Sequence, residues 1–236
     1  PASVGEAMSI TAQEAWVERS TEKNHRVQVP DFMREMIEEV AFLAREEKKI
    51  DKRSGVSQRL PISSLEDAVS SAEQRAARNR EHAAVVAPSD IYSAIPSMTG
   101  KFELEYEGEL RGAESIARDL VRSATGKVFT KYLGDADFQP VVQWFESGGQ
   151  LKLPDQGSAA DRVSALKKIP GLFDHLDRLG SNSKSDPAIQ AAAAEFVLEG
   201  LWAHKRINRS EERGFYGERR TESREVPQQH PRRQYN

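Results

Sequence analysis

Residues 52–68, KRSGVSQRLPISSLEDA, place three cations, a glycine and several hydroxyls directly ahead of an apolar stripe. The stripe has helical spacing, and its expected buried positions are Leu65, Ala68, Val69, Ala72 and Ala76. Pro61 suits the first turn of this helix, and Ser63 with Glu66 has the spacing of a capping box. Because the first turn of a helix presents unpaired N–H groups and a partial positive charge, the stretch is a candidate anion site.

Further helices are expected on the N-terminal side of this stretch. Residues 3–18 repeat apolar side chains at helical spacing, and a more regular amphipathic helix begins at Pro30. Its expected apolar face is Met33, Met36, Ile37, Val40 and Ala44, and its expected polar face includes Glu35, Glu38 and Glu39. Residues 83–86 predict a short extended segment, and a brief capped helix follows up to Pro96. Residues 1–100 are therefore expected to form one helical domain.

A second helical domain is expected over residues 101–207. Phe102, Leu104 and Tyr106 alternate with glutamates, which predicts a strand with a solvated acidic face, paired with residues 150–153 in a small two-stranded sheet. The helices are expected at 112–132, 137–147, 158–168, 170–179 and 187–207. The fold class is thus mainly α with a small two-stranded β element. Residues 208–236 lose periodicity and are rich in Arg, Glu, Gln and Pro, so a disordered tail is expected there.

The composition excludes several classes of chemistry. The chain has 236 residues, with 34 Lys plus Arg against 37 Asp plus Glu, so the net charge of -3 favours no polyanionic partner. The absence of cysteine excludes disulfides, thiolate catalysis and thiolate zinc sites. Neither a signal peptide nor a run of apolar residues long enough to span a membrane occurs. We therefore expect a soluble cytoplasmic protein that does not contact membranes.

No catalytic motif occurs within the 236 residues. Gly100-Lys101 and Gly126-Lys127 resemble fragments of a phosphate-binding loop, but each is followed by an apolar residue where the magnesium-binding hydroxyl is needed. The five histidines have no ligand spacing, so no metal site is expected. No G-x-S-x-G motif occurs.

The loop at 52–59 is therefore the main candidate site. Lys52, Arg53 and Arg59 fall within eight positions, and Gly55 lets the backbone turn. Arg59 lies about one turn ahead of the apolar stripe, so its guanidinium can point at a phosphate in front of the helix. The alternative is that Arg59 pairs with an acid such as Glu66, while the lysine is merely solvated.

The order of these elements resembles the helical lid of an AAA+ ATPase. The succession of two helices, the SGVSQR loop, a long third helix and VVAPSDIYSAI at 85–95 is similar to lids of the MoxR and magnesium-chelatase group. In that group a Gly-x-Ser-x-Arg segment carries the arginine called sensor 2, and Gly55, Ser57 and Arg59 match it. The stretch GKFELEYEGELRG at 100–112 and the helices after it resemble bacterial proteins labelled magnesium chelatase or sigma-54-interacting ATPase.

This resemblance, which covers about residues 1–207, implies an ATPase. Arg59 is implied to contact the γ-phosphate of ATP, with Lys52 and Arg53 as supporting charges. ATP and Mg would be held mainly by a nucleotide-binding domain that precedes Pro1. The group further implies a homo-oligomeric ring and a protein client or partner subunit.

Two departures from the group bear on the reaction. The phosphate-binding loop and the acidic Mg-binding segment are missing from the 236 residues. The region after Gly100 is longer than expected of a magnesium-chelatase ATPase subunit, so remodelling of a client is favoured over porphyrin metallation.

Two alternatives from other classes stay open. In the first, the chain is a helical interaction module that never contacts ATP. In the second, it is a nucleic-acid or transcription-linked adaptor that acts through its Arg-rich tail. That tail carries seven arginines against five acids, and 7 − 5 gives a net charge of +2, which is weak for a nucleic-acid partner.

Overall fold

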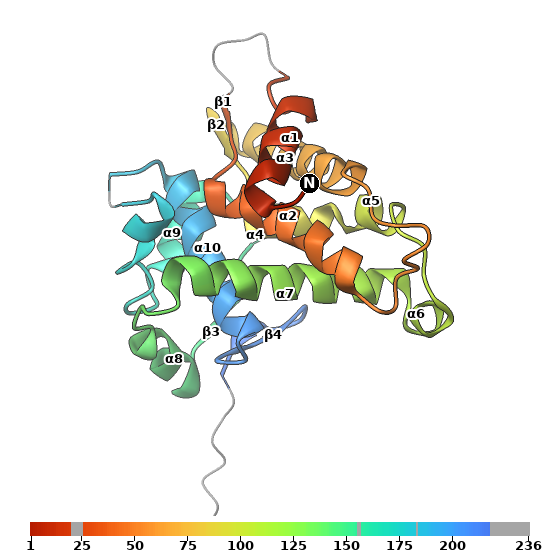
Figure 1. The fold of residues 1–236 in the computed structure, drawn as a ribbon. Coiled ribbons are helices and arrows are strands. Elements are labelled where there is room, and N and C mark those ends of the chain that lie inside the picture. The colour runs from red at the N-terminus through yellow and green to blue at the C-terminus, as the bar shows by residue number, and fades with distance from the viewer. Residues whose placement is uncertain (20–25, 155–156, 183, 218–236) are drawn as a thin grey trace, which may run out of the picture.

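The computed structural model describes residues 1–19, 26–154, 157–182 and 184–217 (Figure 1). Its helices are α1 (Val4–Glu14), α2 (Asp31–Glu46), α3 (Arg59–Asn79), α4 (Pro88–Ser93), α5 (Ile95–Thr99), α6 (Tyr106–Arg111), α7 (Ala113–Leu133), α8 (Gln139–Glu146), α9 (Ala159–Leu166), the 3-10 helix η1 (Leu176–Leu179) and α10 (Pro187–Ala203). Its strands are β1 (Arg26–Gln28), β2 (Ala83–Val85), β3 (Gln150–Leu151), β4 (Asn208–Ser210) and β5 (Gly214–Tyr216). The prediction of a mainly α fold is confirmed.

Two small sheets complete the fold. β1 and β2 pair in parallel, with Val27 opposite Ala84. The second sheet is antiparallel with the strand order β3-β5-β4, and it places Leu151 opposite Phe215. The β structure therefore ties segments that are far apart in the chain.

The predicted pairing of the strand at 102–106 with residues 150–153 was wrong. Leu104 forms only an isolated bridge with Ile50, and the chain then turns into α6. A Cβ at Gly108 in α6 would overlap the carbonyl oxygen of Lys49, so this glycine lets α6 lie against the loop that follows α2 (Figure 1). The glutamates at 103, 105, 107 and 109 are exposed, as expected, although not on a strand.

The prediction of disorder from residue 208 was also wrong for residues 208–217. These residues form the β4–β5 hairpin, which is the true partner of β3. Phe215 is buried, and Gly214 at the start of β5 adopts a positive φ of 70° that favours glycine. The remaining predicted tail, residues 218–236, lies outside the described residues.

Two helix boundaries also differ from the prediction. The segment at 170–179 is mostly turns and ends in the short helix η1, because Gly171 has a positive φ of 77° that interrupts an α-helix. α3 begins at Arg59, so Ser63 lies inside the helix and forms no capping box. Glu66 instead accepts a hydrogen bond from the backbone N–H of Trp16 at 2.9 Å.

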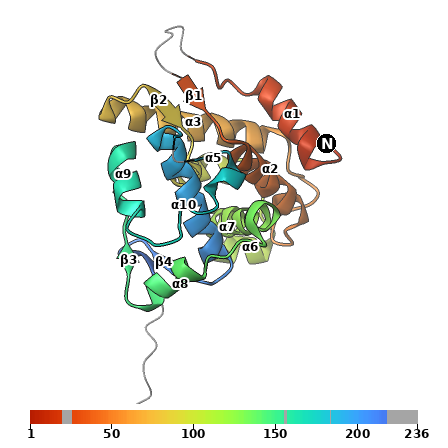
Figure 2. The ribbon, with the colours of Figure 1, turned by 90° about the vertical axis from the view of Figure 1, so that its left-hand side faces the viewer.

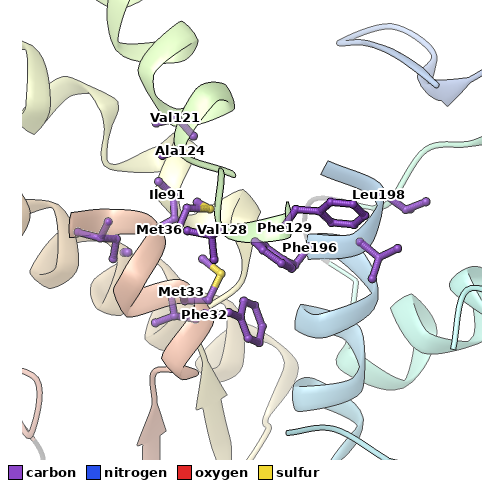
Figure 3. Packing of buried hydrophobic residues seen from close by; sticks show 14 of the residues in the cluster. Phe32, Met33, Met36, Ile91, Val121, Ala124, Val128, Phe129, Phe196 and Leu198 are labelled. Carbon is purple, nitrogen blue, oxygen red and sulfur yellow. The ribbon is translucent and has the colours of Figure 1, made fainter. Parts of the chain in front are cut away.

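The core is formed where α2, α7 and α10 meet. Phe32 and Phe196 lie with ring centroids 4.7 Å apart, and Phe129 lies 6.4 Å from Phe196 (Figure 3). Burial of each such ring contributes roughly 2 kcal/mol. Because α2 precedes residue 100 and α7 and α10 follow it, one core joins both sides of the proposed domain boundary. The division at residue 100 stays a prediction.

The polar face predicted for α2 is buried rather than solvated. Glu35, Glu38 and Glu39 are each less than a tenth exposed. α7 supplies partners for two of them, because the ammonium of Lys131 lies 2.6 Å from Glu35 and that of Lys127 lies 2.7 Å from Glu39. Glu38 instead accepts from the side chain of Gln58 at 2.9 Å. Periodicity could not reveal this, since charges that pair across two helices have the same pattern as charges that face water.

Within the described residues, every helix is too short or too polar to cross a membrane. α10 is the most apolar of the long helices, and it is buried by protein instead: Figures 1 and 2 both show it crossing α7, with α9 alongside.

The crossing of α10 and α7 depends on Gly200, since a Cβ there would overlap the ring of Phe129. We expect Gly200→Ala to lower the free energy of unfolding by about 2 kcal/mol, although alanine is the better helix former. Urea denaturation of both proteins measures this change.

Gly5→Ala is the matched control, because a Cβ at Gly5 in α1 would meet nothing within 4 Å. This variant is expected to be as stable as the wild type or slightly more stable. Equal unfolding midpoints for Gly200→Ala and the wild type would contradict the proposed close contact.

Candidate functional site

The predicted site loop at residues 52–59 is held in place by the hydrogen bonds of two side chains. Arg45 at the end of α2 donates through Nε to the carbonyl oxygen of Val56 at 2.9 Å. Gln58 donates through Nε2 to Thr11 at 3.0 Å and to Glu38 at 2.9 Å. The loop is thereby held against α1 and α2, and Gly55 turns it with a positive φ of 68°.

The three predicted site residues all lie exposed on this loop or at its end. Arg53 turns back onto Asp51, with which it makes two side-chain hydrogen bonds, and this contact lowers the pKa of the Asp51 carboxyl. Lys52 and Arg59 form no ion pair with any described residue. The structure therefore places Lys52 and Arg53 on the loop and Arg59 at the first residue of α3, and it does not join the three in one contact.

The alternative pairing of Arg59 with Glu66 is not formed. Glu66 accepts from the backbone of Trp16, and its own carbonyl accepts from Arg19 at 2.8 Å. The guanidinium of Arg59 is thus exposed at the first residue of α3 and has no carboxylate partner within the described residues.

The helix N-terminus itself offers little to an anion. The N–H of Leu60 already donates to the backbone carbonyl oxygen of Ser57 at 3.1 Å, and Pro61 has no N–H. The first turn therefore presents the Arg59 side chain rather than a cradle of backbone donors.

A second polar site, absent from the sequence-based predictions, is a cleft of about 1080 Å³. Its walls come from α3, α4, α7, α9, α10, the segment after β3 and the β4–β5 hairpin. Six cations line it: Arg75, Arg78, Arg118, Lys152, Arg162 and Arg209. Five acids also line it: Asp67, Asp90, Glu195, Glu199 and Glu211. We call it the arginine cleft.

Two carboxylates of α10 form the floor of the arginine cleft. Glu195 pairs with Arg162 of α9, and both side chains are about 5 % exposed or less. The other oxygen of Glu195 accepts from the N–H of Ser89 at 2.7 Å. This contact joins α4, α9 and α10 at one point.

Glu199 lies one turn further along α10. It accepts from the hydroxyl of Tyr92 at 3.0 Å and lies 2.7 Å from a nitrogen of Arg209. Burial raises the pKa of Glu199 to about 7, and the neighbouring Glu195 adds to the rise while Arg209 opposes it. The guanidinium of Arg209 also lies 4.5 Å from the ring centroid of Tyr92 and 5.4 Å from that of Trp202.

A third buried acid completes the arginine cleft. Asp90 accepts from Arg75, from the hydroxyl of Ser71 at 2.8 Å and from the N–H of Ala87 at 2.8 Å. Burial nevertheless raises the pKa of the Asp90 carboxyl above its ordinary value.

One sequence signal for the arginine cleft was available. Glu195 and Glu199 stand four apart in the apolar run of α10, which is unusual unless cations meet them. Their partners lie 33 and 10 residues away in the chain, so pairing could not be deduced. The sequence predicts Arg209 to lie in the disordered tail. Since Arg209 instead holds the hairpin to α10, a truncation that tests the tail should begin at residue 218.

Within the described ranges, no group of three His, Asp or Glu side chains is arranged to hold a metal ion.

Comparison of the chain with family models, with curated proteins and with solved structures gave no match.

The raised pKa of Glu199 predicts a pH-dependent stability. The Glu199 carboxyl, whose pKa is about 7 in the folded protein and about 4.5 in the unfolded chain, keeps its proton in the folded state over the range between these two values. Stability from this group is thus full below pH 4.5 and is lost as the pH rises through 7, by on the order of 3 kcal/mol. Glu199→Gln should flatten this dependence, as urea unfolding at several pH values would show.

Glu107→Gln, on the exposed part of α6, is the control and should keep the wild-type pH dependence. If Glu199→Gln loses stability between pH 5 and 8 as steeply as the wild type does, the assignment to Glu199 fails.

The Arg162–Glu195 pair predicts strong coupling between the two positions. Arg162→Met leaves a buried carboxylate without its cation and is expected to cost about 3 kcal/mol or more. The double variant Arg162→Met, Glu195→Leu removes both charges and should be more stable than the single variant. Thermal unfolding of the four proteins in this cycle gives the coupling, and additive effects would contradict it.

Proposed function

We propose that this chain is the lid and C-terminal part of a magnesium-chelatase-like AAA+ ATPase, in which Arg59 contacts the γ-phosphate of ATP. The observation that carries this proposal is the state of Arg59: its guanidinium is exposed and unpaired within the described residues, at the end of a fixed loop. Gly55, Ser57 and Arg59 match the sensor-2 segment of that group, which supports the γ-phosphate as the ligand of this guanidinium.

The anchoring of the loop supports this role. An arginine that senses a phosphate must be positioned before the phosphate arrives, because ordering a long side chain and its loop costs conformational entropy. Arg45 and Gln58 hold the backbone on either side of Ser57, and Val56 is buried. Only the side chain of Arg59 then remains to be ordered.

The chemistry asked of Arg59 is electrostatic. A guanidinium offers several N–H donors in a plane and stays protonated, so it offsets the charge on a phosphoryl group as that group is transferred. In the proposed protein, ATP and Mg are held by a nucleotide-binding domain N-terminal to Pro1. A homo-oligomeric ring would let the lid act on the nucleotide of its own or of a neighbouring subunit, and movement of the lid would couple hydrolysis to remodelling of a client.

The two other loop cations have lesser roles. Arg53 is engaged by Asp51, so it contributes long-range charge rather than a direct contact. Lys52 is exposed and adds to the same positive potential.

The first test is to read the encoding DNA upstream of the codon for Pro1. An in-frame G-x-x-x-x-G-K-[ST] followed by an acidic metal-binding segment supports the proposal. An upstream stop codon with no such motif would leave the helical interaction module as the function.

Arg59→Ala in the full-length protein is then expected to lower the kcat of ATP hydrolysis by about a hundredfold or more, with a smaller change in KM for ATP. Steady-state ATPase assays measure both constants. Arg53→Ala is the matched control on the same loop, and it should retain most of the activity because Arg53 is bound to Asp51. Equal effects of the two substitutions would remove the specific role of Arg59.

A further inference from the structure

We propose that α1 is a strap that lifts from α2 and α3, and that Gln58 couples this movement to the loop ahead of Arg59. The coupling requires no nucleotide, so it does not depend on the ATPase proposal. Only its consequence for a phosphate contact of Arg59 rests on that proposal.

Gln58 joins α1 to the loop through its side-chain amide. The amide nitrogen donates to the hydroxyl of Thr11 at 3.0 Å, and it lies 3.4 Å from the carbonyl oxygen of Ala7. The same nitrogen donates to Glu38 of α2 at 2.9 Å, while Arg45 donates to the amide oxygen at 3.3 Å. Because Gln58 is the last residue before α3, these contacts connect the position of α1 to the backbone of the loop.

α1 is attached to the rest of the protein by little buried surface. Of its 11 residues, only Ala7 and Thr11 are buried. Figures 1 and 2 both show α1 on the outside of the protein, against α2 and α3. A helix with so few buried residues opens at a lower free energy than the core helices, because its opening exposes little apolar surface.

The segment that follows α1 is held to α3 and can act as the hinge of the strap. The N–H of Trp16 donates to the carboxylate of Glu66 at 2.9 Å. The guanidinium of Arg19 donates to the carbonyl oxygen of Glu66 at 2.8 Å. Rotation of α1 about this segment separates Thr11 from Gln58 and leaves the hinge contacts in place.

The closed position of α1 carries a cost at Glu38. This carboxylate is buried, and its Oε1 has no hydrogen-bond partner among the described residues. The cavity that Met8, Thr11 and Glu38 help to line has a volume of about 10 Å³, which is at the lower limit for one water molecule. Burial raises the pKa of the Glu38 carboxyl, although the side chains of Thr11 and Gln58 oppose the rise. Lifting of α1 admits water to both carboxylate oxygens, so the open state recovers part of this cost.

The strap therefore has two states with opposing contributions. In the closed state the amide of Gln58 is fully engaged, and the loop is fixed ahead of Arg59. In the open state water hydrates Glu38 and competes for the hydrogen bonds of Gln58, so the loop gains freedom. Any protein segment that binds α1 in one state shifts this balance, and with it the order of the loop.

The absence of cysteine allows a test with single nitroxide labels, whose electron paramagnetic resonance spectra report the mobile fraction at one site. Three single-cysteine proteins carry Ser54→Cys in the loop, Gln13→Cys on α1 and Ser164→Cys on α9, all at exposed positions. Thr11→Val removes the hydroxyl that accepts from Gln58, and it should raise the ratio of mobile to immobile label at position 54 about fivefold. Gln58→Leu should raise the same ratio at position 13.

Two matched controls separate the coupling from a general effect on α1. Thr11→Ser keeps the hydroxyl and should leave the label at position 54 as it is in the wild type. Glu14→Gln changes an exposed residue of α1 and should also have no effect there. The label at position 164 should be unchanged in every variant, since the core stays folded. If Gln58→Leu disturbs that label, Gln58→Asn, which shortens the side chain and keeps the amide, takes its place.

Three results would overturn the proposal. The first is an unchanged label at position 54 in Thr11→Val, and the second is an equal effect of Thr11→Val and Glu14→Gln. The third is a joint rise in mobility at positions 54 and 164 in Thr11→Val, which would indicate general loosening instead of a strap. Failure of Arg59→Ala to lower ATP hydrolysis would leave these outcomes unchanged, so the two proposals are tested separately.

Discussion

The buried carboxylates of α10 are the constraint on which the C-terminal half of the structure depends. α10 is enclosed by protein along most of its length, and an unpaired carboxylate in such a place costs several kcal/mol. Glu195 and Glu199 are therefore compatible with the fold only because Arg162 and Arg209 reach them. These two pairs hold α9 and the β4–β5 hairpin to α10, and the arginine cleft is the space that remains between the elements they join.

The structure uses its arginines in two different ways. Arg162 and Arg209 are buried against carboxylates, so their replacement disturbs folding as well as any ligand. Arg59 and Arg78 are exposed and unpaired within the described residues, so each can be replaced with little effect on the core. Substitution of Arg59 or Arg78 therefore changes contacts with a ligand without removing a buried ion pair.

Local patterns predicted the long helices well and the pairing of segments poorly. The periodic apolar stripes of α2, α3 and α7 found each helix, because helix formation depends on neighbours three and four residues apart. The predicted strand at 102–106 failed since its alternation had no partner, and the hairpin at 208–216 was missed because its few apolar residues are buried by a distant strand. The loop before α3 was found, but its expected first-turn backbone donors are few, because the N–H of Leu60 donates to the carbonyl oxygen of Ser57 and Pro61 has no N–H.

The sequence by itself determined that the fold is mainly α, where its long helices lie and that a loop with three cations precedes α3, since composition and periodicity are local properties. Only the tertiary structure decided which charges are buried and paired. The sequence pattern is the one expected if Glu35 and Glu39 face solvent. In the structure they are buried and paired with Lys131 and Lys127 of α7. The sequence pattern places Arg209 in a disordered tail, whereas the structure pairs it with the buried Glu199. The physical reason is that the cost of burying a charge depends on what lies within a few ångströms in space, and spacing along the chain does not encode that distance.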